Sequence, residues 1–295
     1  MKKIRISDVT MKQASQEVSL SFKEKIELAK LLDKLDVSVI ELEGVRNTKI
    51  DSLRIKSIAS AVQTGVIAVP VQLNRQSVEE TWNALRTAGK PRLQVCAPVS
   101  SVQMEYLYHK KPDAMQASVC DTIEACKAVC SDVEFVADDA TRSDPAFLAQ
   151  IIAAAIQAGA TTVTVCDTAG TMMPEEFAGF VKNLYADIPA LAEVSLGVSC
   201  SNELSMADAC VIAAACQGAE EVKTAAYPVN SASLSNVSRI IAECGGNVTG
   251  VHHERGGTEH VAGCFLRVDM ETKDYEHVEQ IVRALQNEGF KIVER

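Results

Sequence analysis

The sequence predicts an α/β fold, an eight-stranded β/α (TIM) barrel with a small C-terminal β-α-β appendage. Short apolar runs alternate with helical patterns over roughly the first 240 residues, and eight such units in that length fit a closed barrel better than an open doubly wound sheet. The runs read as nearly continuous apolar segments, which is typical of parallel strands buried on both faces. No G-x-G-x-x-G motif follows the first run, so the main reason to prefer a dinucleotide-binding sheet is missing.

The strands can be placed in order along the chain. The first is KIRISDVT at 3–10, and the helix expected at 19–35 has apolar residues at helical spacing, such as Ile26, Ala29 and Leu32. Helical segments of roughly ten to twenty residues separate most of the strands that follow. The other seven predicted strands are VSVIELEG, VIAVPVQ, RLQVCAPVS, VEFVADDA, TTVTVCDTAG, EVSLGVSC and EVKTAAYP.

The pattern changes after residue 245, so we divide the chain into a barrel over 1–245 and an extension over 246–295. Glycine and histidine cluster in GGNVTGVHHERGGTEHVAG, and the chain then reads as strand CFLRVDMET, helix YEHVEQIVRALQNEG and strand FKIVE. Ile281 and Leu285 belong to the single apolar face of that helix. A unit this small buries little core of its own, so we expect it to pack on the barrel or against a second subunit of a homodimer.

The composition excludes some classes of partner. The chain has 295 residues, a hydrophobic content of 47% and a formal net charge of −10. Binding a phosphate backbone needs a concentrated basic face, so we expect no nucleic-acid partner. No apolar stretch is long enough to cross a bilayer, so we expect no membrane partner either. Ten cysteines without framework spacing, and no signal peptide at the start, predict free thiols in a reducing cytoplasm.

Candidate site residues follow the predicted strands. Active sites of β/α barrels lie at the C-terminal ends of the strands, and here carboxylates, hydroxyls and basic groups gather at those ends. Such a rim suits a small polyoxygenated acid. Ser199 and Ser201 alternate along the seventh strand and therefore point to the same side. The strand-end residues are Asp8, Thr10, Lys12, Gln13, Glu41, Glu43, Ser100, Asp138, Asp139, Thr141, Arg142, Asp167, Thr168, Ser199, Ser201, Asn202, Glu203, Tyr227 and Asn230.

Four segments carry a resemblance to a known family. They are IRISDVTMKQASQEVSLSFKEKIELAKLLDKLDVSVIE, VEFVADDATRSDPAFL, VCDTAGTMMPEEF and GVSCSNELSMADACVIAAACQGAEEV. They resemble the isopropylmalate synthase, homocitrate synthase and hydroxymethylglutaryl-CoA lyase superfamily, over roughly residues 4–243. The resemblance implies the same β/α barrel and the making or breaking of a carbon–carbon bond next to a carbonyl. It also implies an acyl-CoA and a 2-oxo acid as substrates, with a divalent metal as the Lewis acid.

The chain departs from the family pattern where the family binds its metal. The first strand of the family usually reads D-T-T-L-R-D-G, and Lys12 and Gln13 replace its catalytic arginine and metal-binding aspartate. Ser199 and Ser201 replace the two histidines of the usual H-x-H on the seventh strand, and N-D after it has become N-E. The usual G-E-R-A-G-N loop has become VNSASLSN, in which Asn236 alone matches. A neutral amide and two alcohols are weak ligands for a divalent ion, so the sequence predicts no metal at the family site.

The substrate-side pattern is better kept, and it defines the predicted site. By the resemblance, four residues stand where the family has acidic, hydroxyl and basic groups, namely Glu41, Asp138, Thr168 and Arg142, with Asp138 one methylene shorter than the usual glutamate. The predicted ligand is a small carboxylic or 2-oxo acid, and an acyl-CoA stays open as a co-substrate. The predicted catalytic residues are Lys12, Asp138 and Thr168, and the predicted substrate-binding residues are Glu41, Arg142, Ser199, Ser201 and Asn202.

Several interpretations of the activity stay open. The first is a divergent synthase or lyase whose ancestral metal-dependent reaction is lost or much altered. A metal-independent lyase could use Lys12 or Lys223 as a Schiff-base nucleophile, although Lys12 could equally pair with a substrate carboxylate. A barrel without catalysis could bind a metabolite or a protein partner through the same pocket. A metal could also be held elsewhere, although the spacing of the ligand types in the extension matches no standard motif; these are His252, His253, Glu254, His260 and Cys264.

Overall fold

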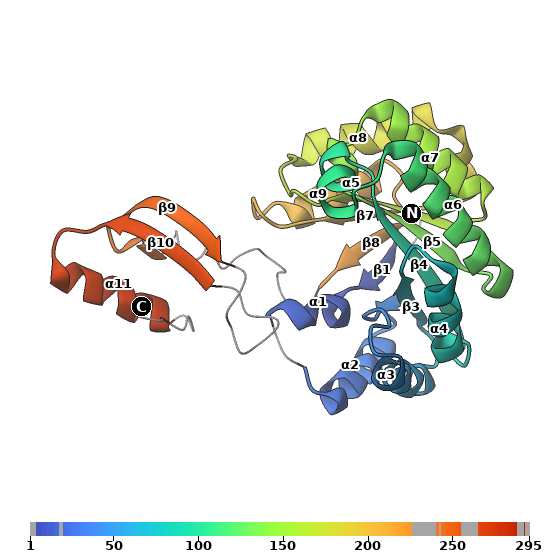
Figure 1. Ribbon diagram of the computed structural model, residues 1–295, viewed down its shortest axis with the longest axis horizontal. Coiled ribbons are helices and arrows are strands. Elements are labelled where there is room, and N and C mark those ends of the chain that lie inside the picture. The colour runs from blue at the N-terminus through green and yellow to red at the C-terminus, as the bar shows by residue number, and fades with distance from the viewer. Residues whose placement is uncertain are drawn as a thin grey trace. The chain divides into compact units, whose positions relative to one another are not determined.

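Eight parallel strands close into a barrel in the order β1-β2-β3-β4-β5-β6-β7-β8, with β1 paired to β8 (Figure 1). The predicted eight-stranded β/α barrel is therefore confirmed. The computed structural model describes residues 4–17, 20–225, 240–241, 243–254, 265–287 and 292. The barrel strands are β1 (Arg5–Asp8), β2 (Val39–Glu41), β3 (Val66–Val71), β4 (Pro91–Pro98), β5 (Val133–Asp138), β6 (Thr162–Asp167), β7 (Ser195–Cys200) and β8 (Glu221–Thr224).

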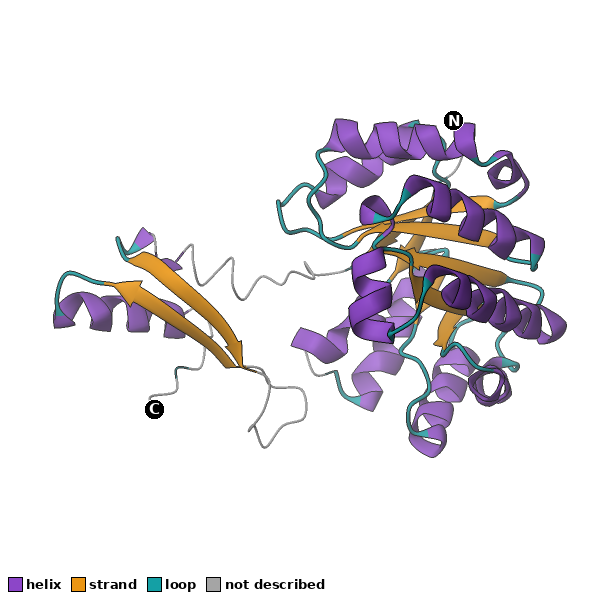
Figure 2. Ribbon diagram, turned by 45° about the horizontal axis from the view of Figure 1, so that its top comes forward, coloured by secondary structure: helices purple, strands orange, loops and turns teal. Residues whose placement is uncertain are grey.

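Helices surround the strands on the outside of the barrel (Figure 2). Their starts carry the expected local signals: Ser21 forms a capping box with Glu24, and Asp144 caps a helix whose first residue is Pro145. Within the described residues, no helix combines the length and the apolar character that crossing a membrane requires. The barrel helices are α1 (Thr10–Glu17), α2 (Phe22–Lys34), α3 (Thr48–Ala61), α4 (Arg75–Leu85), α5 (Ser101–Tyr108), α6 (Pro112–Val129), α7 (Pro145–Gln157), α8 (Pro174–Asp187) and α9 (Ala207–Cys216), with short 3-10 helices η1 (Ala140–Arg142) and η2 (Pro189–Glu193).

The apolar core lies between the strands and the helices, and the barrel interior is polar. Val95 on β4 and Phe135 on β5 are paired across the two strands, and both belong to the main hydrophobic cluster. Their neighbours Gln94 and Glu134 are also paired, point to the other side of the sheet, and are hydrogen-bonded to each other. Barrel interiors are usually filled by branched aliphatic side chains. The apolar runs of this sequence therefore supply the outer core, and the polar residues between them fill the barrel.

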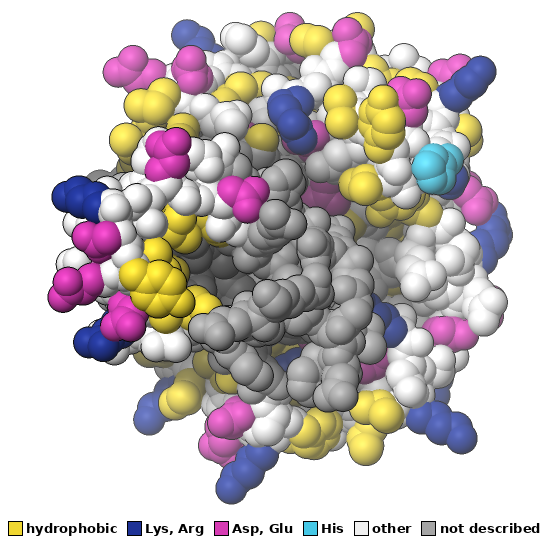
Figure 3. Space-filling view, turned by 60° about the vertical axis from the view of Figure 1, so that its left-hand side comes forward, with side chains coloured by type: hydrophobic (Ala, Val, Ile, Leu, Met, Phe, Trp, Pro, Cys, Tyr) yellow, Lys and Arg dark blue, Asp and Glu magenta, His cyan; other side chains and the backbone are white. Residues whose placement is uncertain are grey.

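Charge is distributed over the surface. On the part of the surface drawn in colour in Figure 3, acidic, basic and hydrophobic side chains are interspersed. Some large apolar side chains are exposed, among them Tyr106 and Leu107 of α5.

The C-terminal unit begins earlier in the chain than expected. The chain divides into Met1–Val229 and Asn230–Arg295, before the expected boundary at residue 245. The boundary moves because Ile240 and Ile241 pack with Ile281 and Leu285 in a small core of the second unit.

In the described part of the second unit, the expected strand and helix are present as β10 (Phe265–Glu271) and α11 (Tyr275–Asn287), and a further strand, β9 (Asn247–Glu254), pairs antiparallel with β10. The sequence analysis did not predict β9, because this strand lies in the glycine- and histidine-rich stretch, which lacks apolar periodicity. The expected last strand at 290–294 lies outside the described residues, except for Ile292.

Candidate functional site

Lys12 and Glu41 form an ion pair at the mouth of the barrel, where the strands end. Lys12 follows β1 at the start of α1, and Glu41 is the last residue of β2. Lys12 Nζ lies 2.7 Å from Glu41 Oε2 and 3.2 Å from Gln94 Oε1. Glu41 is fully buried, whereas the Lys12 side chain is 26% exposed. The ammonium group of Lys12 is thus held by two acceptors from neighbouring strands, and its side chain is partly exposed.

The ionisation of this pair is fixed by its surroundings. Burial by itself would raise the pKa of Glu41, but the ammonium groups of Lys12 and Lys223 outweigh burial and hold that pKa well below its usual range. Burial would lower the pKa of Lys12, but Glu41 outweighs it and holds that pKa above its usual value. Lys223 has a raised pKa for the same reason, with Glu134 and Glu41 as its main partners. A Schiff base needs a neutral amine, so this geometry favours two charged ammonium groups over a lysine nucleophile.

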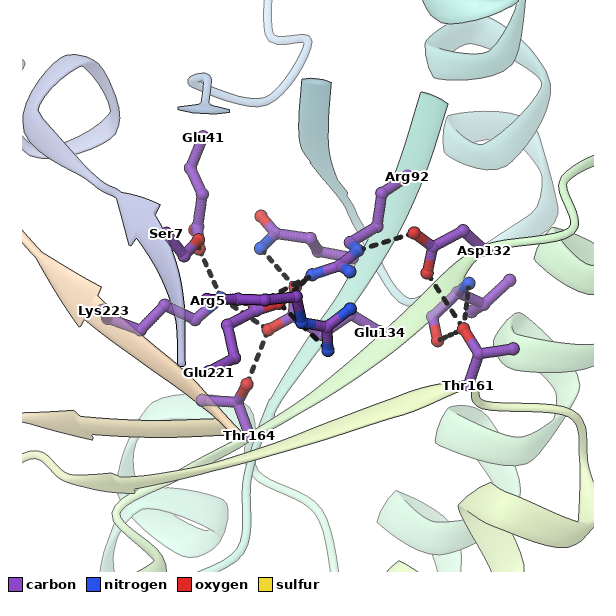
Figure 4. A network of polar contacts seen from close by, with 12 residues as sticks. Arg5, Ser7, Glu41, Arg92, Asp132, Glu134, Thr161, Thr164, Glu221 and Lys223 are labelled. Atoms are coloured by element: carbon purple, nitrogen blue, oxygen red, sulfur yellow. Dashed lines mark hydrogen bonds and ion pairs between the residues drawn. The ribbon is translucent and has the colours of Figure 1, made fainter. Parts of the chain in front are cut away.

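Below the mouth, the ion pairs continue into the barrel (Figure 4). Lys223 on β8 pairs with Glu41 and, at 2.5 Å, with Glu134 Oε1. Thr164 donates to Glu134 at 2.6 Å and Ser7 donates to Glu41 at 2.7 Å. These contacts leave the buried carboxylates of Glu41 and Glu134 satisfied by hydrogen bonds as well as by charge.

At the end of the barrel opposite the mouth, the series of ion pairs ends at Arg92. Arg92 Nη1 lies 2.9 Å from Glu221 Oε1, and Arg92 Nε lies 3.0 Å from Asp132 Oδ2. Arg5 Nη2 lies 3.4 Å from Glu221 Oε2. Sequence reasoning missed Arg92, Glu134 and Glu221 as part of this network. The available signal was their spacing within β4, β5 and β8, where polar residues alternate with apolar ones.

Asp138, the last residue of β5, faces the interior at the mouth. It lies on the same side of β5 as Glu134, and the Cys166 thiol of β6 hydrogen-bonds to it. Burial raises the pKa of Asp138 to about 6, and the charge of Lys12 opposes part of that rise. A carboxyl group with such a pKa can both accept and donate a proton near neutral pH. Burial also raises the pKa of the neighbouring Cys96 thiol to about 12, so this thiol stays protonated.

Asp139 follows β5 at the turn into the next loop, and it is hydrogen-bonded to two predicted site residues, Arg142 and Thr168. It adopts the left-handed backbone region (φ 61°) and is fully buried. Its carboxylate accepts two hydrogen bonds from Arg142, both at 2.7 Å, and one from Ser100 at 2.5 Å. Its backbone N–H donates to Thr168 Oγ1 at 2.8 Å. The contacts of Arg142 and Thr168 therefore hold the loop that presents Asp138, and their roles toward a substrate stay predictions.

Ser199 and Ser201 lie at the mouth end of β7 and just beyond it, both partly exposed. Ser199 is on the side of β7 occupied by Gly197, where a Cβ atom would lie 2.3 Å from Thr164 Oγ1 inside the barrel. The loop after β6 crosses closely over Ser201, because a Cβ on Gly170 (φ 61°) would lie 2.7 Å from the Ser201 carbonyl oxygen. A role of the two serines in substrate binding stays a prediction.

Asn202 has a capping contact. Its Oδ1 accepts a hydrogen bond of 3.1 Å from the backbone N–H of Ala207, the first residue of α9. Binding of a substrate by Asn202 stays a prediction. Of the other candidates, Tyr227, Asn230, Asn236, His260 and Cys264 lie outside the described residues, and His252, His253 and Glu254 are described only as backbone of β9.

The donor groups at the mouth do not fit a divalent metal of the kind that the resemblance implies. Glu41, a carboxylate at the mouth, has an ammonium group on each of its oxygens. Ser199 and Ser201 offer neutral hydroxyls in place of imidazoles. Across the described part of the chain, no three His, Cys, Asp or Glu side chains converge to hold a metal ion.

The closed parallel barrel, with a cation and a titratable carboxyl group at its C-terminal mouth, defines a β/α-barrel protein of the kind that carries polar sites at its strand ends. The chain belongs to the HMGL-like family, whose model matches residues 3–227. The predicted superfamily resemblance is therefore confirmed.

Several relatives of similar sequence are synthases. A 2-isopropylmalate synthase of Clostridium kluyveri is 34% identical over 226 residues, which cover 76% of this chain and 44% of the relative. The 2-isopropylmalate synthase B of Solanum pennellii is 31% identical and covers 88% of this chain and 45% of its own length. The chloroplastic methylthioalkylmalate synthase 1-1 of Eutrema japonicum is 34% identical, with 75% and 46% covered. The chain thus spans about half the length of the curated relatives it matches.

Solved structures share the fold at lower identity. The HMG-CoA lyase of Bacillus subtilis superposes with a TM-score of 0.64 at 17% identity, covering 82% of this chain and 87% of the lyase. The carboxyl transferase domain of Rhizobium etli pyruvate carboxylase, solved with pyruvate, gives a TM-score of 0.58 at 13% identity, with 76% and 40% covered. These likenesses support the barrel architecture.

Proposed function

We propose that this chain makes or breaks a carbon–carbon bond next to the carbonyl of a small 2-oxo acid, at the barrel mouth and without a divalent metal. The observation that carries the proposal is the pairing of a fixed cation, Lys12, with a titratable carboxyl group, Asp138, at the strand ends. The names of the relatives support the reaction class, since they include 2-isopropylmalate synthases and an HMG-CoA lyase. An acyl-CoA is the proposed co-substrate in the bond-forming direction.

The proposed roles follow from the charge of each group. Lys12 has three N–H donors, of which Glu41 and Gln94 take two, so a further donor can face the carboxylate or carbonyl oxygen of the ligand. In bond formation, the carboxylate of Asp138 removes a proton from the carbon next to the thioester carbonyl of the acyl-CoA, and the resulting carbanion attacks the carbonyl carbon of the 2-oxo acid. The C=O electron pair moves to oxygen, that oxygen takes the same proton from Asp138, and water then hydrolyses the thioester and releases free CoA. In cleavage, Asp138 removes the hydroxyl proton, the C=O bond forms again, and the departing carbanion takes that proton from Asp138.

The test is a turnover assay in the presence of a chelator. The protein is incubated with acetyl-CoA and a panel of 2-oxo acids that includes pyruvate, and free CoA thiol is measured. We expect turnover that EDTA does not lower, and a loss of about 10²- to 10⁴-fold in Asp138→Asn, since acid–base groups contribute on that order. A second variant, Lys12→Met, removes the cation of the site. Lys30→Met, at an exposed position, is its surface control. Full dependence on an added divalent metal would overturn the proposal.

The second candidate is a barrel that binds a metabolite without turnover. The replacement of metal-binding residue types by Gln13, Ser199 and Ser201 favours it. Thermal-shift screening with the same compounds separates the two, since binding without any product would support this candidate. We further propose a cytoplasmic location, because nine described cysteines are free thiols. We also propose a homodimer, which sedimentation velocity would test.

A further inference from the structure

The charged side chains inside the barrel alternate in sign from the mouth downward. Those below Lys12 are labelled in Figure 4. Lys12 contacts Glu41, and Glu41 also contacts Lys223. Lys223 Nζ lies 2.5 Å from Glu134 Oε1, and Glu134 Oε2 lies 3.5 Å from Arg92 Nη1. A cation is therefore the last fixed charge of this series at the mouth.

Glu41 is shared by two ammonium groups, and this sharing decides how positive the mouth is. A carboxylate has one negative charge, and an ion pair with Lys12 alone would leave little net charge toward a ligand. Lys223 pairs with the same carboxylate from below, so the negative charge of Glu41 compensates the charge of Lys12 less fully. Glu134, the second partner of Lys223, is one contact further from the mouth and limits this effect.

Lys223 cannot serve as a direct ligand contact in this arrangement. Its side chain is 6% exposed, and its ammonium group lies against Glu41, Glu134 and, at 3.6 Å, Glu221. Its influence on a ligand must therefore pass through Glu41 and Lys12. Electrostatic influence of this kind is strong in a buried, poorly solvated site and reaches beyond direct contact.

We infer that Lys223 is a positioning residue that makes the barrel mouth select a ligand with one negative charge over an uncharged one. This inference rests on the proposed function for the chemical class of the ligand, a 2-oxo acid. It assigns Glu134 the opposite influence, because Glu134 competes with Glu41 for the same ammonium group.

A merely structural role for Lys223 makes a different prediction. Removing either Lys223 or Glu134 leaves a buried charge without its partner, so both Lys223→Met and Glu134→Gln should lower the free energy of unfolding. Structural damage would lower ligand affinity in both variants. The electrostatic role instead moves the affinity for an anion in opposite directions, down in Lys223→Met and up in Glu134→Gln.

The experiment compares two ligands that share a carbonyl and differ in charge, pyruvate and its uncharged methyl ester. Dissociation constants are measured by calorimetry on the full chain, in the wild type, both variants, Lys223→Arg and the surface control Lys30→Met. We expect pyruvate affinity to fall about tenfold in Lys223→Met and to rise in Glu134→Gln. The affinity for methyl pyruvate should change little, and Lys223→Arg should keep the preference for the anion. A fall in both variants, or equal effects on both ligands, would overturn the inference.

A second readout does not depend on the ligand. The titration of Asp138 is followed by ¹³C NMR of labelled aspartate and assigned with Asp138→Asn. Because Lys12 lowers the pKa of Asp138, a less positive mouth in Lys223→Met should move the titration midpoint up, and Glu134→Gln should move it down. If wild-type protein binds neither ligand, the proposed function fails while this readout still decides the inference. An Asp138 midpoint that stays in place in both variants would refute it.

Discussion

Asp138 and Asp139 are neighbours in the chain, but their carboxyl groups lie on opposite sides of the strand end and have different partners. Asp138 faces the barrel with Cys166 as its hydrogen-bond partner, and burial raises its pKa to about 6. Asp139 faces the loop, where Arg142 and Ser100 satisfy its carboxylate. One residue is therefore available for proton transfer, and the other fixes the backbone that presents it.

The raised pKa of Asp138 predicts a pH-dependent gain in stability for Asp138→Asn. The folded-state pKa of about 6 is above the ordinary aspartate value of 3.8, so the folded chain binds more protons and this group lowers stability as pH rises from about 4 to about 6. Asparagine cannot ionise, so the variant should be about 1–3 kcal/mol more stable than wild type at pH 7 and similar at pH 4. Urea unfolding at both pH values measures the difference.

Asp139→Asn is the control for this prediction. It weakens the ion pair with Arg142 and should lower stability at pH 7. A destabilised Asp138→Asn at neutral pH would show that the carboxylate of Asp138 is needed for folding, and it would contradict the assigned environment.

Gly197→Ala should destabilise the barrel from within. A Cβ at this position would lie 2.3 Å from Thr164 Oγ1, which donates to the buried Glu134. The expected loss is about 1–3 kcal/mol, as for other over-packed positions, measured by denaturant unfolding. Gly179→Ala in α8 is the matched control, since nothing lies within 4 Å of its added Cβ. Helix propensity favours alanine there by about 0.5–1 kcal/mol, so the two substitutions should differ in sign.

Glu41→Gln should convert Lys12 from a cation into a nucleophile. Burial lowers the pKa of Lys12 and the charge of Glu41 is the largest effect that opposes it, so removing this carboxylate should bring that pKa down. A neutral amine can form an imine with pyruvate and release water, and borohydride reduces that imine to a stable adduct. Mass spectrometry should find the adduct at Lys12 in Glu41→Gln and none in Lys12→Met/Glu41→Gln. An adduct of equal yield in the wild type would mean that Lys12 is not held as a cation.

Restoring the family residue types should create metal affinity. The triple variant Gln13→Asp, Ser199→His and Ser201→His places a carboxylate and two imidazoles at the mouth, all of them good ligands for zinc or manganese. We expect calorimetry to detect one bound Zn²⁺ or Mn²⁺ per chain, with Gln13→Asp alone as the weaker-binding control. If the folded triple variant binds neither ion, the assignment of Gln13, Ser199 and Ser201 to the metal positions is wrong.

The barrel and its mouth could be predicted because they depend on local order along the chain. Strand-length apolar runs, separated by helical segments, specify the β/α repeat, and the ends of the strands specify where Lys12, Glu41 and Asp138 lie. One strand and the boundary of the second unit could not be predicted in the same way. Its β9 strand lacks the apolar periodicity that marks the others, and its boundary depends on Ile240 and Ile241 packing with α11.

Local order along the chain was enough to specify the eight-stranded barrel and the family. What fills the space below the mouth depends on how the strands close into the barrel. Glu41 on β2 and Lys223 on β8 are 182 positions apart, and barrel closure brings them into contact. A pKa depends on burial and on charges within a few ångströms, neither of which is encoded in spacing along the chain. Whether Lys12 is a cation or a nucleophile was therefore decided by the fold.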